Sequence, residues 1–168
     1  NLFLDLCENS PMPFSALFKA ANLYLCCASP ERFLKKQGQT LLTQPIKGTI
    51  KRGKTQQEDE DLKKQLAESE KEQAENLMIV DLMRNDLARI AQTGSVKVEE
   101  LFGIYSFKQI SQMISSVICR LPPSIGFEEI VSQTFPMGSM TGAPKVKCME
   151  LIETYEKFKR SWFSGSMG

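Results

Sequence analysis

The feature that most constrains the fold is an apolar stripe at helical spacing near the middle of the chain. The stripe consists of Met78, Ile79, Leu82, Met83, Leu87 and Ile90. Residues three and four positions apart lie on one side of an α-helix, so the stripe predicts a helix that begins near Glu75 and buries one face. Thr93-Gly94 provides a stop signal at its C-terminal end. The rest of the chain must therefore supply a surface that covers this helix.

The segments around this helix have the patterns of strands and of two further helices. We expect strands at 23–28, 33–34, 40–42, 95–98 and 105–120, and helices at 127–134 and from Pro144 to about Phe158. A glycine-containing loop at 136–144 opens the last helix. Charged and amide residues dominate 51–72, which predicts a solvated helix or a mobile loop. The pattern as a whole predicts an α/β (α+β) domain with one core.

Composition narrows the classes of function. The 168 residues are 42% hydrophobic and 24% charged, as in a soluble globular domain. Lys plus Arg number 21 against 20 Asp plus Glu, without a basic stripe, so we expect no nucleic-acid partner. No apolar run approaches the roughly 20 residues of a membrane span, and no secretory signal is seen, so a cytoplasmic protein is expected. Five cysteines without regular spacing and the lack of histidine argue against a zinc site.

Lys47 is the first candidate for chemistry. It follows a strand-like segment, beside the apolar Ile46 and before Gly48, where the backbone can approach a ligand closely. A lysine amine attacks only when it is neutral, and apolar surroundings favour that form. The alternative is an ordinary solvated lysine, which is the commoner case on local sequence alone.

Two carboxylates are further candidates. Glu31 lies in a turn on the path to Lys47 and could act as a general acid or base, although a surface glutamate paired with Arg32 fits the local sequence as well. Glu75 lies at the polar tip of the apolar stripe, where a carboxylate suits Mg²⁺ or is simply solvated. Arg84, Asn85 and Asp86 are expected to form structural hydrogen bonds with a neighbouring strand.

A loop of small residues at 138–145 precedes the last predicted helix, with Pro144 at its first turn. Free backbone N–H groups at such a helix start can bind an anion. The spacing is not that of a P-loop, so the loop is better suited to a carboxylate than to a nucleoside triphosphate. A helix cap without a ligand is the alternative.

Five ordered motifs together resemble the chorismate-utilising enzyme family. They are SPERF at 29–33, PIKGT at 45–49, AENLMIVDLMRNDL at 74–87, FPMGSMTGAPK at 135–145 and SGSMG at 164–168. The resemblance covers essentially all of 1–168. It implies a part of the two-sheet α/β sandwich of that family, with the active site between the sheets.

The resemblance also implies roles for individual residues. It makes Lys47 the nucleophile at C2 of chorismate, Glu31 the general acid that expels the C4 hydroxyl, and Glu75 a ligand of Mg²⁺. The predicted substrate-binding residues are Gly48 and Thr49, then Thr141, Gly142 and Ala143 at the ring carboxylate, and Gly165 and Gly168 at the enolpyruvyl carboxylate.

Lys47 also indicates which branch of the family is concerned. A lysine at this position is typical of members that aminate chorismate at C4 on the way to p-aminobenzoate and folate, and an alanine is typical of anthranilate-forming members. Gln112 stands where many members have a histidine, which excludes histidine-assisted chemistry and further disfavours anthranilate formation. A non-catalytic binding domain that keeps only the scaffold is an alternative of another class.

The resemblance implies chorismate as substrate and a glutamine amidotransferase subunit as the source of ammonia, because without histidine this chain has no Cys-His pair for glutamine hydrolysis. Family members carry a second magnesium glutamate and a carboxylate-binding arginine beyond the SGSMG segment, and a part before the position of Asn1. We therefore expect 1–168 to be a partial catalytic domain that is inactive alone.

Overall fold

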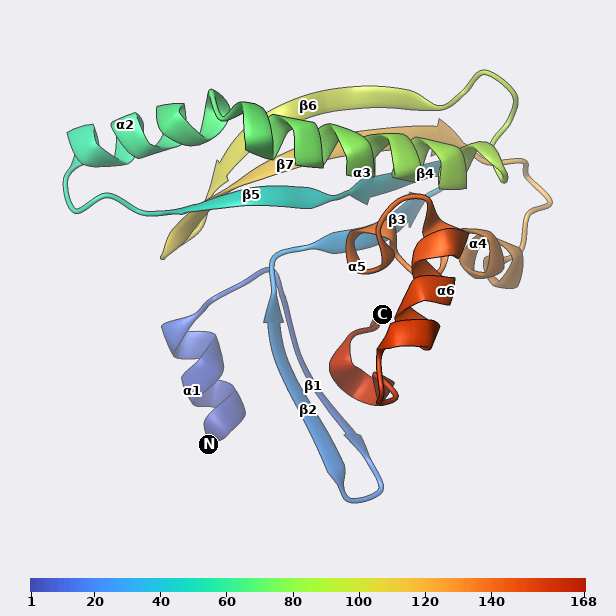
Figure 1. Ribbon diagram of the computed structural model, residues 1–168, viewed down its shortest axis with the longest axis horizontal. Coiled ribbons are helices and arrows are strands. Elements are labelled where there is room, and N and C mark those ends of the chain that lie inside the picture. Colours follow the sequence, from blue (N-terminus) through green and yellow to red (C-terminus); the bar gives the residue numbers. More distant parts are fainter.

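The computed structural model describes residues 1–168 and has the expected mixture of strands and helices (Figure 1). The strands are β1 (Phe14–Ala20), β2 (Leu23–Ser29), β3 (Arg32–Gln37), β4 (Thr40–Gln44), β5 (Ile46–Lys51), β6 (Lys97–Ser106) and β7 (Ile110–Arg120). The helices are α1 (Leu2–Asn9), α2 (Gln56–Ala67), α3 (Glu70–Ala88), α4 (Phe127–Thr134), α5 (Gly138–Thr141) and α6 (Lys145–Tyr155), with a 3-10 turn at Ser161–Phe163. None of the helices is both long and apolar enough for a membrane crossing.

The main layer is an antiparallel sheet of five strands in the order β3-β4-β7-β5, with β6 also paired to β7. Helices α2 and α3 run along this sheet, and α3 packs on β7 and β5 (Figure 1). The predicted helix is therefore confirmed, and the sheet is the surface that covers it.

The hydrophobic core lies between α3 and the sheet. It is formed by Leu41, Val80, Leu87, Ile90, Val117, Cys119, Leu121 and Ile130. Burial at this interface stabilises the fold, because apolar area removed from water contributes roughly 25 cal/mol per Å². Met78 of the predicted stripe departs from this arrangement, since it is 46% exposed. The buried face of α3 is rotated so that the polar Asn76 takes a place in the interior.

A second, two-stranded sheet is formed by the hairpin of β1 and β2. In Figure 1 this hairpin projects away from the five-stranded sheet, on the same side of the molecule as α5 and α6. The Phe18 ring packs against Trp162, with 5.5 Å between ring centroids, so the hairpin is tied to the C-terminal segment. The α/β class with two sheets is confirmed.

The single strand predicted at 105–120 is wrong. The structure has two strands there, β6 and β7, joined by a tight turn that the hydrogen bond from Phe107 N to Ile110 O closes at 2.7 Å. The turn contains neither glycine nor proline, so the sequence pattern continued through it. The short strand expected at 95–98 is accordingly the start of the ten-residue β6.

Of the two alternatives for the charged segment at 51–72, the helix is confirmed: the segment contains α2, which is capped by Thr55 through a hydrogen bond from Glu58 N. Two other boundaries differ from the prediction. The loop at 136–144 contains the four-residue helix α5. The last helix ends at Tyr155 and does not reach Phe158.

Candidate active site

An irregularity in β5 positions Lys47 and Gly48. Ile46 pairs with Ile114 and Thr49 pairs with Gln112, so two residues of β5 stand opposite the single Met113 of β7. Such a bulge bends the strand and redirects its side chains. Gly48 has φ +91°, and a Cβ atom there would meet the Glu72 Cβ at 3.1 Å. This backbone conformation and the close approach of α3 both favour glycine.

Glu31 lies at the junction of β2 and β3 and comes close to Lys47. Burial raises the pKa of its carboxyl above the ordinary value. Hydrogen bonds with the Ser139 side chain and the Ile46 backbone, together with the positive charge of Lys47, act in the opposite direction. The structure thus brings together the two residues predicted to be catalytic.

Helix α5 brings Ser139 to Glu31. Its first residue, Gly138, lies so close to α3 that an added Cβ atom would stand 2.5 Å from Leu82 Cδ2 and 2.7 Å from Met83 Cε. Only glycine permits this approach without displacement of the neighbours. The glycine therefore sets the position of the adjacent Ser139 relative to α3.

Thr49 and Gln112 form a polar pair next to the bulge of β5. Gln112 Nε2 donates a hydrogen bond of 3.2 Å to Thr49 Oγ1. The Gln112 Oε1 atom is buried without a hydrogen-bond partner. Thr49 itself is exposed, so its hydroxyl is accessible to a ligand.

Glu75 is accompanied on α3 by a second carboxylate. Lys71 Nζ lies 3.7 Å from an oxygen of Glu75 and 3.7 Å from an oxygen of Glu72. The Glu75 side chain is 46% exposed and that of Glu72 is 25% exposed. A Cβ atom on Gly48 would stand 3.2 Å from Glu72 Oε2, so the Glu72 carboxylate lies beside the β5 bulge.

No group of three or more His, Cys, Asp or Glu side chains in residues 1–168 could hold a metal ion. An ion at Glu75 would therefore take one or two carboxylates from this chain and the rest of its ligands from water or substrate. Mg²⁺ is commonly bound in this way. The donor set fits this cation.

The residues predicted to bind the ring carboxylate lie at the end of α5, which finishes at Thr141, and in the loop of Gly142 and Ala143 before α6. Thr141 Oγ1 donates to Met137 O at 3.5 Å, and Gly142 N donates to Gly138 O at 2.9 Å. Helix α6 begins after Pro144 without a side-chain cap, so Ala143 leads directly into an uncapped helix start.

Gly165 and Gly168 are exposed in the C-terminal segment. Their neighbour Ser166 places its Oγ atom 3.3 Å from Met137 Sδ, which brings this segment to the start of α5. The roles of these glycines in binding remain predictions.

The expectation for Arg84, Asn85 and Asp86 is wrong. Arg84 pairs with Asp81 at 2.8 Å on the exposed side of α3, and Asn85 is exposed. Asp86 is buried but binds Lys145 of α6 and not a strand. Helical phase decides this outcome, because 84 and 85 fall on the side of α3 that faces away from the sheet.

Asn76 is the polar residue of α3 that does bind a strand. Ser115 Oγ donates to Asn76 Oδ1 at 2.6 Å, and Asn76 Nδ2 donates to Met113 O at 3.3 Å. Both partners lie in β7, so this buried network fixes the helix on the sheet beside the bulge.

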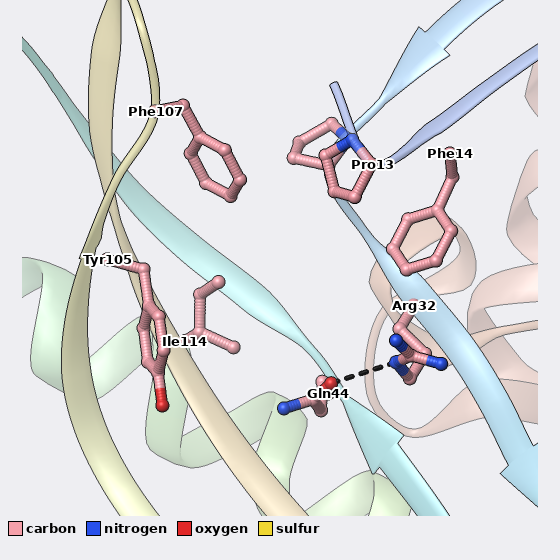
Figure 2. A pocket seen from close by; sticks show the side chains of 8 residues that line it. Pro13, Phe14, Arg32, Gln44, Tyr105, Phe107 and Ile114 are labelled. Carbon is pink, nitrogen blue, oxygen red and sulfur yellow. Dashed lines mark hydrogen bonds between the residues drawn. The ribbon is translucent and has the colours of Figure 1, made fainter. Parts of the chain in front are cut away.

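A separate cavity lies on the face of the five-stranded sheet that points away from α3 (Figure 2). Ser115 faces α3, so Ile114, which precedes it in the strand, points to the other face, and there it helps to line a cavity of about 150 Å³. Arg32 Nε donates to Gln44 Oε1 at 2.9 Å within this cavity, and the Arg32 guanidinium lies 4.9 Å from the centre of the Phe14 ring. None of the predicted site residues lines it.

Sequence reasoning gave no role to Ser139 or Glu72, which the structure places next to predicted site residues. Ser139 lies within a recognised motif, but nothing local indicated that it faces Glu31. Glu72 precedes Glu75 by three positions, so the two share one face of a helix. This spacing in the sequence could have predicted that Glu72 lies beside Glu75.

Comparisons with known proteins agree with these motifs. Residues 1–168 match the model of the family described as chorismate binding enzyme. The chain is 49% identical to the aminodeoxychorismate synthase, chloroplastic, of Arabidopsis thaliana, covering 99% of this chain and 18% of that protein. It is 43% identical to aminodeoxychorismate synthase component 1 of Escherichia coli (strain K12), covering 99% of this chain and 37% of that protein.

A solved structure shows the same fold. The crystal structure of anthranilate synthase component I from Streptococcus pneumoniae TIGR4 matches with a TM-score of 0.81 and 31% identity, over 94% of this chain and 34% of that one. The chain thus spans less than half the length of the relatives it matches here. It belongs to the chorismate binding enzyme family.

Proposed function

We propose that the protein containing this chain is an aminodeoxychorismate synthase component I, which converts chorismate and ammonia to 4-amino-4-deoxychorismate for p-aminobenzoate and folate synthesis. The observation that carries the proposal is the position of Lys47 at the β5 bulge, near enough to Glu31 for its charge to lower the pKa of that carboxyl. The names of relatives that are 41–49% identical over nearly all of this chain support the same reaction.

The proposed reaction has two displacements. The Lys47 amine forms a bond to C2 of chorismate, the ring double bonds shift, and the C4–O bond breaks as Glu31 delivers a proton, so that water leaves. Ammonia then bonds to C4, the double bonds shift back, and the C2–N bond to Lys47 breaks. The Lys47 nitrogen leaves as the neutral amine, and Glu31 recovers its one proton from the ammonium group formed at C4. Dividing one difficult substitution into two steps is the general advantage of covalent catalysis.

The surroundings of Glu31 support its role as an acid. A general acid must carry its proton at the pH of the reaction, and burial favours the protonated carboxyl by raising its pKa. Ser139 and the Ile46 backbone stabilise the charged form that remains after proton transfer. The site therefore supports both states of the carboxyl.

The negative charge of the substrate carboxylates would be bound by residues from several helices and loops. Glu75, with Glu72 beside it, would hold Mg²⁺, which supplies positive charge for the substrate ring carboxylate. Thr141, Gly142 and Ala143 would bind that carboxylate. The remaining predicted contacts with substrate are those of Gly48, Thr49, Gly165 and Gly168.

Ammonia would come from a glutamine amidotransferase subunit. The bacterial relatives are named component 1, which implies a second component. The lack of histidine in this chain excludes an internal Cys-His glutaminase within 1–168. The cytoplasmic location expected from the sequence also remains a prediction.

Product identification tests this proposal. The full-length protein is incubated with chorismate, Mg²⁺ and ammonium, and the product is identified by mass and fluorescence. We expect 4-amino-4-deoxychorismate from the wild type and its loss in Lys47→Ala. Lys51→Ala, which removes an exposed lysine of the same strand, is the matched control and should retain activity.

The other outcomes are equally clear. Anthranilate as the product would leave the family assignment intact and show that Lys47 does not determine the branch. An absence of turnover by the full-length protein with its partner would favour a non-catalytic domain.

A further inference from the structure

The most buried ion pair of the chain, between Lys145 and Asp86, does not include Lys47 or Glu31. Lys145 Nζ, at the start of α6, binds Asp86 Oδ2 on α3 and donates a second hydrogen bond of 3.0 Å to Thr134 O at the end of α4. The Asp86 side chain is 3% exposed and that of Lys145 is 12% exposed. One ammonium group therefore joins three separate helices in the interior.

This pair is unlike the other ion pairs on the same helices. Lys147 and Glu150 pair on the surface of α6, with side chains 64% and 59% exposed. Exposed pairs of this kind contribute little to stability, whereas a buried charge that loses its partner is strongly unfavourable. Burial raises the pKa of Asp86, while Lys145 and Arg89 oppose that rise. The ionised form of Asp86 therefore depends on its contact with Lys145.

Two attachments to α3 flank the segment 139–144, and the Asp86–Lys145 pair is the attachment at its C-terminal end. At the other end, Gly138 packs directly on Leu82 and Met83 of α3. Between these two attachments lies Ser139, whose side chain is close enough to the Glu31 carboxyl to lower its pKa. The position of Ser139 therefore depends on both attachments.

We propose that Asp86 and Lys145 form a positioning pair, which holds α5 and the loop before α6 on α3 so that Ser139 stays on the catalytic Glu31. This inference rests on the proposed function for its effect on the reaction, but not for its effect on the loop. Neither residue touches the reacting atoms of the proposed reaction. Their effect passes through Ser139 and the backbone of 138–144.

The first test measures the loop and not the reaction. Hydrogen exchange is followed in peptides covering 136–144 of the full-length protein, for wild type, Lys145→Met, and the double variant Asp86→Asn with Lys145→Met. The double variant leaves no unpaired buried charge, so it separates loss of the attachment between Asp86 and Lys145 from general misfolding. Lys147→Met is the matched control, because it makes the same change two residues further along the same helix.

We expect exchange in 136–144 to rise by about tenfold or more in both variants that lack Lys145, and to stay unchanged in Lys147→Met. Exchange in β7 should not change in any of them. Equal protection of 136–144 in wild type and both variants would overturn the proposal, whatever the activity. A loss of protection throughout the chain in both variants would overturn it too, because the pair would then serve overall stability.

The second test uses the reaction. Misplacement by about 1 Å can cost on the order of 10²-fold in rate, so kcat should fall by that order in Lys145→Met. Because the Ser139 hydrogen bond lowers the pKa of Glu31, its loss should shift the Glu31 limb of the pH–rate profile to higher pH. Ser139→Ala should give the same shift, and the two changes together should give no further shift.

A drop in rate without the shift would contradict a path through Ser139. If the full-length protein makes a different product, the proposed function fails, but the exchange experiment still decides whether the pair positions the loop.

Discussion

The carboxyl of Glu31 lies close enough to Lys47 for the lysine charge to lower its pKa, although Glu31 lies between β2 and β3 and Lys47 lies in β5. Lys47 lies at the bulge of β5, and Ser139 of α5 also acts on the Glu31 carboxyl. Burial has the larger effect on Glu31 and raises its pKa, so the pair combines an amine with a carboxyl that tends to keep its proton. The proposed chemistry requires both properties.

Replacement of Glu31 by Gln should lower kcat by about 10²–10⁴-fold, the usual contribution of general acid catalysis. Glutamine keeps the size of the side chain but has no proton to deliver near neutral pH. The measurement is the pH dependence of chorismate amination. In the wild type, activity should fall as pH rises through the raised pKa of Glu31, and this limb should be missing in Glu31→Gln. A variant with wild-type kcat would remove Glu31 from the acid role.

The same replacement should change stability in a pH-dependent way. The folded-state pKa of Glu31 is raised, so its contribution to stability is present below the unfolded pKa and is lost as pH rises through the folded pKa. Glu31→Gln removes this loss. We expect the Tm of Glu31→Gln to exceed that of the wild type near neutral pH, with the gain shrinking in acid. A gain that is constant with pH would not arise from this titration.

Gly138→Ala should destabilise the protein by about 1–3 kcal/mol, because the new methyl group overlaps Leu82 and Met83. The free energy of unfolding is measured by denaturant titration. Gly126→Ala is the matched control, since a Cβ atom there meets no neighbour within 4 Å. Equal stability of the two variants would show that α5 does not pack closely on α3.

Glu75→Gln should weaken the binding of Mg²⁺, so that half-maximal activity shifts to a higher Mg²⁺ concentration by about tenfold or more, in line with the weaker binding of a neutral amide. Glu72→Gln should have a smaller effect in the same direction. Glu68→Gln, on the surface of the preceding helix, serves as control. Titration of Mg²⁺ after chelation measures these shifts, and an unchanged requirement in Glu75→Gln would exclude it as a ligand.

The sequence predicts those parts of the fold in which local pattern and tertiary packing agree. The stripe along α3 meets β7 and β4, and its helix is confirmed. The pattern failed at the turn between β6 and β7, because Phe107, Lys108 and Gln109 lack turn residues and the turn depends on pairing between the strands. The β5 bulge was missed for a similar reason, since it is a property of two strands.

In the candidate site as well, local motifs are predictable from the sequence and contacts between distant segments are not. Motifs predicted Lys47 and Glu31 together, but the approach of Ser139 to Glu31 depends on how α5 packs. Asp86 was expected to bind a strand, and it binds Lys145, which is 59 residues away in sequence. A single sequence indicates that a buried charge needs a partner, but it does not identify that partner.

The proposed reaction requires a covalent bond between Lys47 and the substrate. Peptide mass spectrometry detects this bond in the full-length protein after incubation with chorismate and Mg²⁺ in the absence of ammonia, when the second displacement cannot proceed. We expect an added mass of chorismate less water on the peptide that contains Lys47, and none in Lys47→Ala. Amination by a wild-type protein that never carries this adduct at Lys47 would contradict the proposed reaction.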